Sequence, residues 1–154
     1  LGPLHWRHHR QNLWRTDQLI DLGYGSRSIK SLLDSGSLVR LRYGCYARGS
    51  VWNALPAPVR SRQLIYAHAH GTPTTSTGAF AYSHTSAARL HRLYLWNVDE
   101  LIHVLQRVRP SAERHGKDVR CHTRPFSDTE LTQVGGLRTT SLERTAADCA
   151  MLPG

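Results

Sequence analysis

The polar residues of one short segment, residues 26–31, have the chemistry to recognise double-stranded DNA. An arginine guanidinium can form two hydrogen bonds with the edge of a guanine, and hydroxyl or ammonium groups can bond phosphate oxygens. An apolar residue, Ile29, interrupts the segment, so the polar side chains would lie largely off the apolar face of a helix. The candidates for contacts with bases or phosphates are Ser26, Arg27, Ser28, Lys30 and Ser31.

A second group of candidate DNA contacts follows in residues 38–43. Residues 38–42 alternate apolar side chains with Arg40 and Arg42, which is the pattern of a strand with one basic face. Tyr43 and the glycine after it indicate a tight turn, and residues 45–47 would form the returning strand. We expect Arg40, Arg42 and Tyr43 to face a minor groove or the sugar-phosphate backbone.

Ten histidines raise the question of a metal site. His84 and His91 are two helical turns apart, and His103 and His122 could be neighbours across a sheet. None of them has the spacing of a zinc motif, and the three cysteines form no Cys-x-x-Cys pair. We therefore expect no metal and no cofactor, and we expect His84 to bond the backbone near a helix start.

Ser83, His84 and Asp148 are the residue types of a hydrolase triad, but no Gly-x-Ser-x-Gly sequence surrounds the serine. Ser83 is better explained as the residue that caps a helix. Glu143 follows Thr140 at the spacing of a capping box, and it has no second carboxylate in a recognisable arrangement for phosphoryl transfer. The sequence predicts no catalytic residue, so we do not expect an enzyme.

Two short helices and a hairpin must position the candidate DNA contacts. Thr16 would cap the first helix, which ends at Gly23, and Ser26 would cap the second, which ends at Gly36. The order helix, glycine turn, helix, hairpin is typical of a winged helix-turn-helix. We expect the elements to pack through Leu19, Ile20, Leu22, Ile29, Leu32 and Leu33.

The remaining segments predict an additional N-terminal helix and a second, mixed module. Residues 50–60 contain two prolines and indicate a linker that feeds a helix. We therefore predict an α+β protein, with a winged helix-turn-helix at 1–55 and a small α/β domain at 56–154. The other predicted elements are helices at 4–12, 59–70, from 83 onward and at 145–151, an apolar segment at 79–82, and strands at 101–105, 119–122 and 134–139.

Charge is divided unevenly along the chain. Residues 1–62 hold ten basic and three acidic side chains, a net +7, whereas residues 63–154 hold ten and eight, a net +2. A basic N-terminal part favours binding to a polyanion there. The chain has no apolar run of membrane-spanning length, no secretory signal, and three widely spaced cysteines, so we expect a cytoplasmic protein without a membrane partner.

Four segments of the chain together carry a family resemblance: Gly23–Ile29, Gly36–Ala47, Ser83–His91 and Gly136–Asp148. They resemble the AbiEi antitoxins of type IV toxin–antitoxin systems, in particular their actinobacterial branch. The resemblance implies a winged-helix DNA-binding domain that represses its own operon. It also implies a second α/β domain that helps to counter a nucleotidyltransferase-type toxin.

The sequence and the resemblance together predict a sequence-specific duplex-DNA-binding transcriptional repressor, of the antitoxin type that regulates its own operon. Its expected partners are double-stranded DNA, a nucleotidyltransferase-type toxin and a second copy of the chain. Two alternatives stay open: the DNA-binding part of a larger nuclease-like protein, and a winged helix that binds only a protein toxin. Because the sequence stops directly after a helix, we expect it to be a piece of a longer protein.

Overall fold

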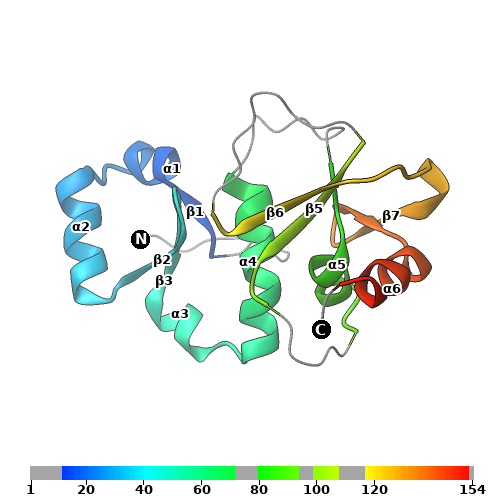
Figure 1. Cartoon of the computed structure of the whole chain (residues 1–154). Helices are drawn as coiled ribbons and strands as arrows, with labels where there is room; N and C mark the ends of the chain where they lie inside the picture. The colour runs from blue at the N-terminus through cyan, green and yellow to red at the C-terminus, as the bar shows by residue number, and fades with distance from the viewer. Residues whose placement is uncertain (1–11, 72–79, 94–98, 108–116, 153–154) are drawn as a thin grey trace. The chain divides into compact units, whose positions relative to one another are not determined.

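The computed structural model describes residues 12–71, 80–93, 99–107 and 117–152 (Figure 1). The helix expected at 4–12 falls outside these residues except for Asn12. Two compact units are present, Leu1–Pro73 and Thr74–Gly154. The described residues hold six α-helices, a three-stranded antiparallel sheet and a five-stranded mixed sheet. This confirms a mixed α+β protein.

The first unit combines four helices with the small sheet, whose strand order is β1-β3-β2. Strands β2 and β3 form the hairpin that the alternating segment predicted, and β1, which the sequence analysis did not predict, pairs with β3. The elements are β1 (Trp14–Arg15), α1 (Thr16–Asp21), α2 (Ser26–Ser35), β2 (Leu38–Arg42), β3 (Cys45–Arg48), α3 (Gly49–Ala54) and α4 (Ala57–Gly71).

Helices α1 and α2, together with their N-caps, begin one residue earlier in the chain than predicted. The N-cap of α1 is Arg15 rather than Thr16, and the N-cap of α2 is Gly25 rather than Ser26. Thr16 and Ser26 are the first helical residues instead. Helix α2 ends at Gly36, whose φ of 81° is the left-handed conformation that glycine adopts without steric cost.

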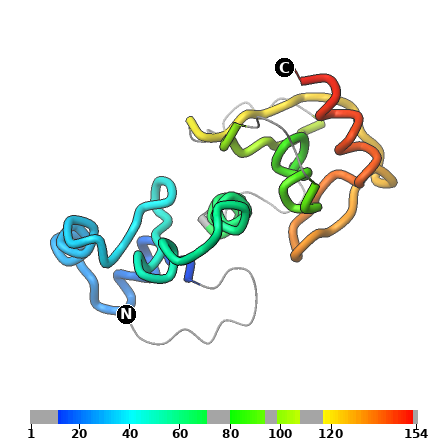
Figure 2. The backbone as a smooth tube through the Cα atoms, turned by 90° about the horizontal axis from the view of Figure 1, so that it is seen from below, coloured from blue at the N-terminus to red at the C-terminus, as the bar shows by residue number. Residues whose placement is uncertain are grey.

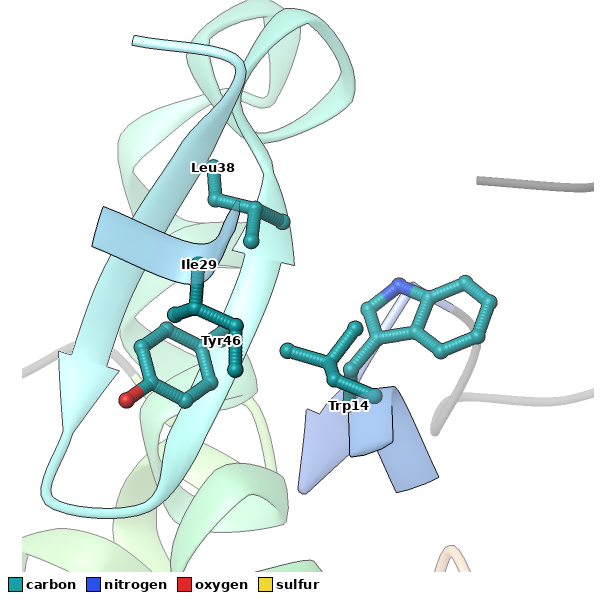
Figure 3. Close-up of a cluster of buried hydrophobic side chains, with 5 residues drawn as sticks. Trp14, Ile29, Leu38 and Tyr46 are labelled. Atoms are coloured by element: carbon teal, nitrogen blue, oxygen red, sulfur yellow. The ribbon is translucent and has the colours of Figure 1, made fainter. Parts of the chain in front are cut away.

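A buried cluster holds α1 and α2 against the sheet (Figure 3). Leu32 and Leu33 of α2 pack against this cluster, as expected. The expectation that Ile20 and Leu22 also pack inside is wrong, because their side chains are 56% and 54% exposed. Helix α1 is short and presents one apolar side chain inward, so its other apolar residues face solvent. The buried members of the cluster are Trp14, Leu19, Ile29, Leu38 and Tyr46.

The expected linker at 50–60 is wrong for most of its length, because α3 and the start of α4 occupy it. Pro58 lies in the first turn of α4, where a helix tolerates the missing N–H group. Helix α4 packs on β2 and β3. It therefore belongs to the first unit, and the division between the units falls after Pro73 rather than after residue 55.

The second unit is built on the larger sheet, with strand order β6-β5-β4-β8-β7. Strands β5 and β6 are parallel, as are β4 and β8, while the other neighbours are antiparallel. The elements are β4 (Ala81–Tyr82), α5 (His84–Leu90), β5 (Ile102–Gln106), β6 (Val119–Thr123), the 3-10 helix η1 (Asp128–Glu130), β7 (Leu131–Val134), β8 (Leu137–Thr140) and α6 (Leu142–Ala150).

Helix α5 packs on β5 and beside α6, and Figure 2 shows the two helices side by side. The strand predicted at 134–139 is a hairpin, because Gly135 and Gly136 both have positive φ and turn the chain between β7 and β8. The predicted capping box is wrong by one residue: Ser141, not Thr140, caps α6 through a bond from the Arg144 N–H. In the described ranges, no helix has the length and apolar character to cross a bilayer.

Candidate functional site

The side chains that the sequence placed on one helix face are all on the surface of α2. Ser26, Arg27, Ser28, Lys30 and Ser31 are exposed, while Ile29 between them is 6% exposed and belongs to the core. The alternation of roles comes from helical geometry, since the apolar stripe occupies one side of the helix. The predicted polar surface therefore exists, and its contact with DNA stays a prediction.

The electrostatic surroundings of α2 favour an anion. Its N-cap is a glycine with no capping side chain, and its first turn contains no acidic residue. The first backbone N–H groups of a helix lack partners within the helix and carry partial positive charge. In the part of the chain that the structure describes, no ion pair involves Arg27 or Lys30.

The hairpin presents its basic residues differently from the prediction. Arg40 is exposed, and its guanidinium carbon lies 5.4 Å from the ring centre of Tyr43, whose side chain is 86% exposed at the turn. The β2–β3 register shifts between Arg40 and Arg42, so the regular alternation is broken, and Arg42 is half-buried. The expectation of one face carrying both arginines is therefore corrected: Arg40 and Tyr43 form the exposed pair.

The second unit contains a cluster of three histidines, which we call the histidine cluster: His84, His103 and His122. A ring nitrogen of each lies within 4.8 Å of a ring nitrogen of the other two. His103 Nδ1 is 2.9 Å from His122 Nε2, and the rings of His84 and His122 stack with centres 3.7 Å apart. His84 and His103 are buried, and His122 is half-buried.

The histidine cluster is assembled by three elements. His84 is the first residue of α5, and its φ of 52° is unusual for a residue with a side chain. His103 and His122 lie on the parallel pair β5 and β6, where His103 opposes Arg120 and Leu105 opposes His122. The two histidines are thus two residues apart in register and share one face of the sheet.

Burial keeps the histidine cluster neutral. It lowers the pKa of all three imidazoles below the ordinary 6.5. The pKa of His122 falls to about 4, first because of burial and then because two other imidazoles adjoin it. The carboxylate of Asp99 opposes this effect on His103, since its Oδ1 is 3.1 Å from His103 Nε2. At neutral pH each ring therefore has one unprotonated nitrogen, whose lone pair can accept a hydrogen bond or bind a metal ion.

Ser83, His84 and Asp148 are not arranged as a triad. We expected His84 to bond the backbone near the helix start. Instead, His84 Nδ1 lies 2.7 Å from Ser83 Oγ and bonds its neighbour's hydroxyl. Asp148 accepts a hydrogen bond from Arg144 Nε at 2.9 Å. Arg144 also bonds Glu130 at 2.9 Å, which makes the Asp148 carboxylate part of a network that joins α6 to η1.

Sequence reasoning found two of the three residues of the histidine cluster. The expectation that His103 and His122 could be neighbours across a sheet is confirmed. The addition of His84 was missed, because it depends on the pairing of β4 with β5, which brings the start of α5 beside β5. No local pattern around His84 indicates this placement.

Comparisons with known proteins leave the family of this chain open. No protein-family model matches it, and no curated protein matches it either.

Proposed function

We propose that the first unit binds duplex DNA as a winged helix-turn-helix, with α2 in the major groove and the β2–β3 hairpin as the wing. The observation that carries the proposal is the polar face of α2: five exposed hydroxyl and cationic side chains lie on a helix whose other face is fixed in the core. The exposed pair of Arg40 and Tyr43 would then reach the neighbouring backbone or minor groove.

The charge of the first unit supports this proposal. Ten of the twenty basic residues of the chain lie in residues 1–62, against three of its eleven acidic residues. Nonspecific attraction to phosphates grows with such an excess, and base contacts from Arg27 would add sequence preference. A DNA-reading helix on a basic unit is the combination that a regulator needs.

We propose further that the protein is a transcriptional repressor of the AbiEi antitoxin type, acting in the cytoplasm on its own operon. The support is the resemblance of Gly23–Ile29, Gly36–Ala47, Ser83–His91 and Gly136–Asp148 to that family. The second unit would then make the contact with a nucleotidyltransferase-type toxin or with a second copy of the chain.

The test begins with selection of genomic fragments that the protein retains, followed by footprinting of the enriched site. Arg27→Ala should weaken binding to that site by roughly 5- to 150-fold, the equivalent of about 1–3 kcal/mol, and relax preference at one base pair. Arg40→Ala, which removes the exposed guanidinium of the wing, should weaken all sequences similarly and lower the salt slope by about one. Arg124→Ala, which removes the same charge from an exposed site in the second unit, is the matched control.

The same experiment separates the alternatives. If neither Arg27→Ala nor Arg40→Ala changes binding to the enriched site, the docking of α2 and the hairpin is wrong. If the protein retains no fragment in excess competitor DNA, our proposal is wrong. The alternative, a winged helix that binds only a protein toxin, then takes its place. Cleavage of plasmid DNA in the presence of Mg²⁺ would instead establish a nuclease.

A further inference from the structure

The histidine cluster of the second unit has a chemistry that DNA binding does not use. His84, His103 and His122 come from α5, β5 and β6, and each brings a ring nitrogen to within 4.8 Å of the other two. Clustering three imidazoles in a largely buried place is costly unless their nitrogens find partners. A bound cation would give all three nitrogens the same partner.

We propose that His84, His103 and His122 bind one divalent transition-metal ion of the zinc class. Imidazole nitrogen is a preferred ligand of such ions, whereas Mg²⁺ and Ca²⁺ select oxygen. Three protein ligands on a four-coordinate ion leave one position for water or another donor. The site is independent of the proposed DNA surface, which lies in the other unit.

The partners around the histidine cluster orient two of its rings as ligands. The Asp99 carboxylate accepts from His103 Nε2, at 3.1 Å, which leaves His103 Nδ1 with its lone pair toward the cluster. Ser83 Oγ lies 2.7 Å from His84 Nδ1, which leaves His84 Nε2 as the ligand atom. A carboxylate or hydroxyl behind a ligating histidine is the usual support of metal-binding imidazoles.

The distances within the cluster are close to those a metal needs. Two nitrogens bound to one tetrahedral zinc ion are about 3.3 Å apart, given bonds of about 2.0–2.1 Å. The 2.9 Å between His103 Nδ1 and His122 Nε2 is slightly shorter, and the limit of 4.8 Å for the cluster is somewhat longer. Binding of one ion would require side-chain rotations that unstack the rings of His84 and His122.

The proton balance of binding follows from the hydrogen bonds. Because His103 Nδ1 is an acceptor, the hydrogen in the 2.9 Å contact belongs to His122 Nε2. Coordination by His122 Nε2 requires that proton to leave and Nδ1 to take one up from water. The imidazole stays neutral, so binding at neutral pH releases no net proton from these three rings.

The experiment uses the full chain in which the N-terminal histidines His5, His8 and His9 are replaced by glutamine, because such a group can itself bind metal. After treatment with EDTA and its removal, the protein is titrated with Co²⁺ and Zn²⁺. We expect one equivalent of Co²⁺ to bind at micromolar concentration with the visible spectrum of a nitrogen-ligated tetrahedral ion. Zn²⁺ should displace it and raise the melting temperature.

Three further substitutions in that background test the ligands. His122→Gln should lose at least about 100-fold in affinity, and Asp99→Asn, behind His103, about 10- to 100-fold. His91→Gln is the matched control: His91 Nε2 lies 2.8 Å from the Thr140 carbonyl oxygen, outside the cluster, and its loss should leave affinity unchanged.

The result is decisive in either direction. Absence of Co²⁺ binding at micromolar concentration, or equal affinity of His122→Gln and His91→Gln, would show a hydrogen-bonded histidine cluster without a metal function. If His122→Gln does not fold, paramagnetic shifts of histidine ring signals in the Co²⁺-loaded background protein give the answer. Shifts confined to three rings other than His91 support the site, and their absence overturns it.

Discussion

The close approach of α3 to the end of α2 gives the most exacting test of the first unit. A Cβ added at Gly49 would lie 2.1 Å from the carbonyl oxygen of Gly36 and 3.3 Å from its carbonyl carbon. Ordinary contact begins near 3.4 Å, so Gly49→Ala forces a displacement of more than an ångström between backbone segments. The same place holds a hydrogen bond of 2.9 Å from Gly49 N to Ser37 O.

The expected cost follows from overpacking. Forcing atoms into a filled space costs about 1–3 kcal/mol, and more when rigid backbone must move. For a unit of this size, that loss lowers the melting temperature by roughly 5–20 °C. Gly36 also ends α2, so the displacement tilts the helix that carries the candidate DNA contacts. If α2 binds DNA as proposed, affinity for the enriched DNA fragment should therefore fall along with stability.

The assay is urea unfolding of the full chain, followed by circular dichroism and by the fluorescence of its four tryptophans, which include the buried Trp14. Ser50→Ala, at the exposed next position of α3, is the control and should change the free energy of unfolding by less than about 0.5 kcal/mol. A Gly49→Ala protein as stable as the Ser50→Ala protein would refute the packing of α3 against the end of α2.

Further predictions concern reactivity, an ion-pair network and pH. Burial raises the pKa of the Cys45 thiol to about 11. A thiol reagent at neutral pH should therefore label the exposed Cys121 first, and Cys45 only after unfolding. Mass spectrometry of the peptides measures this order of labelling. Arg144→Ala should cost roughly 1–3 kcal/mol in urea unfolding, because it removes the guanidinium from Asp148 and Glu130; an unchanged midpoint would count against the network. A backbone amide and Arg144 hold the pKa of Glu130 below its usual 4.5. Its stabilising effect is therefore complete above that pH and is lost as the pH falls through the lower folded value, so the penalty of Arg144→Ala should shrink on acidification.

The parts of the fold that depend on neighbouring residues could be predicted from the sequence. The apolar stripe of α2 and the glycine after it define a helix with no tertiary information, and the alternation in residues 38–42 defines a strand. The exposed polar face of α2 follows from the same stripe. The caps were predicted one residue too late because Thr16 and Ser26 are preferred cap residue types, whereas the N-caps are Arg15 and Gly25.

The parts that depend on distant residues could not be predicted. Pro56 and Pro58 suggested a linker, yet α4 is held by β2 and β3, which no local pattern records. The bulge that separates Arg40 from Arg42 arises from pairing with β3. The histidine cluster needed His84 beside two strands that follow it much later, and this placement exists only in the assembled sheet.

The brevity of β4 has a consequence for how the second unit folds during synthesis. Its two residues, Ala81 and Tyr82, connect the β5–β6 side of the sheet to the late hairpin through the single register pair Tyr82↔Thr139. That contact closes a long loop, and long loops form slowly. We expect the segments carrying all three clustered histidines to leave the ribosome and pair before β8 arrives. A metal ion present at that time would bind a nascent chain and act as a folding template.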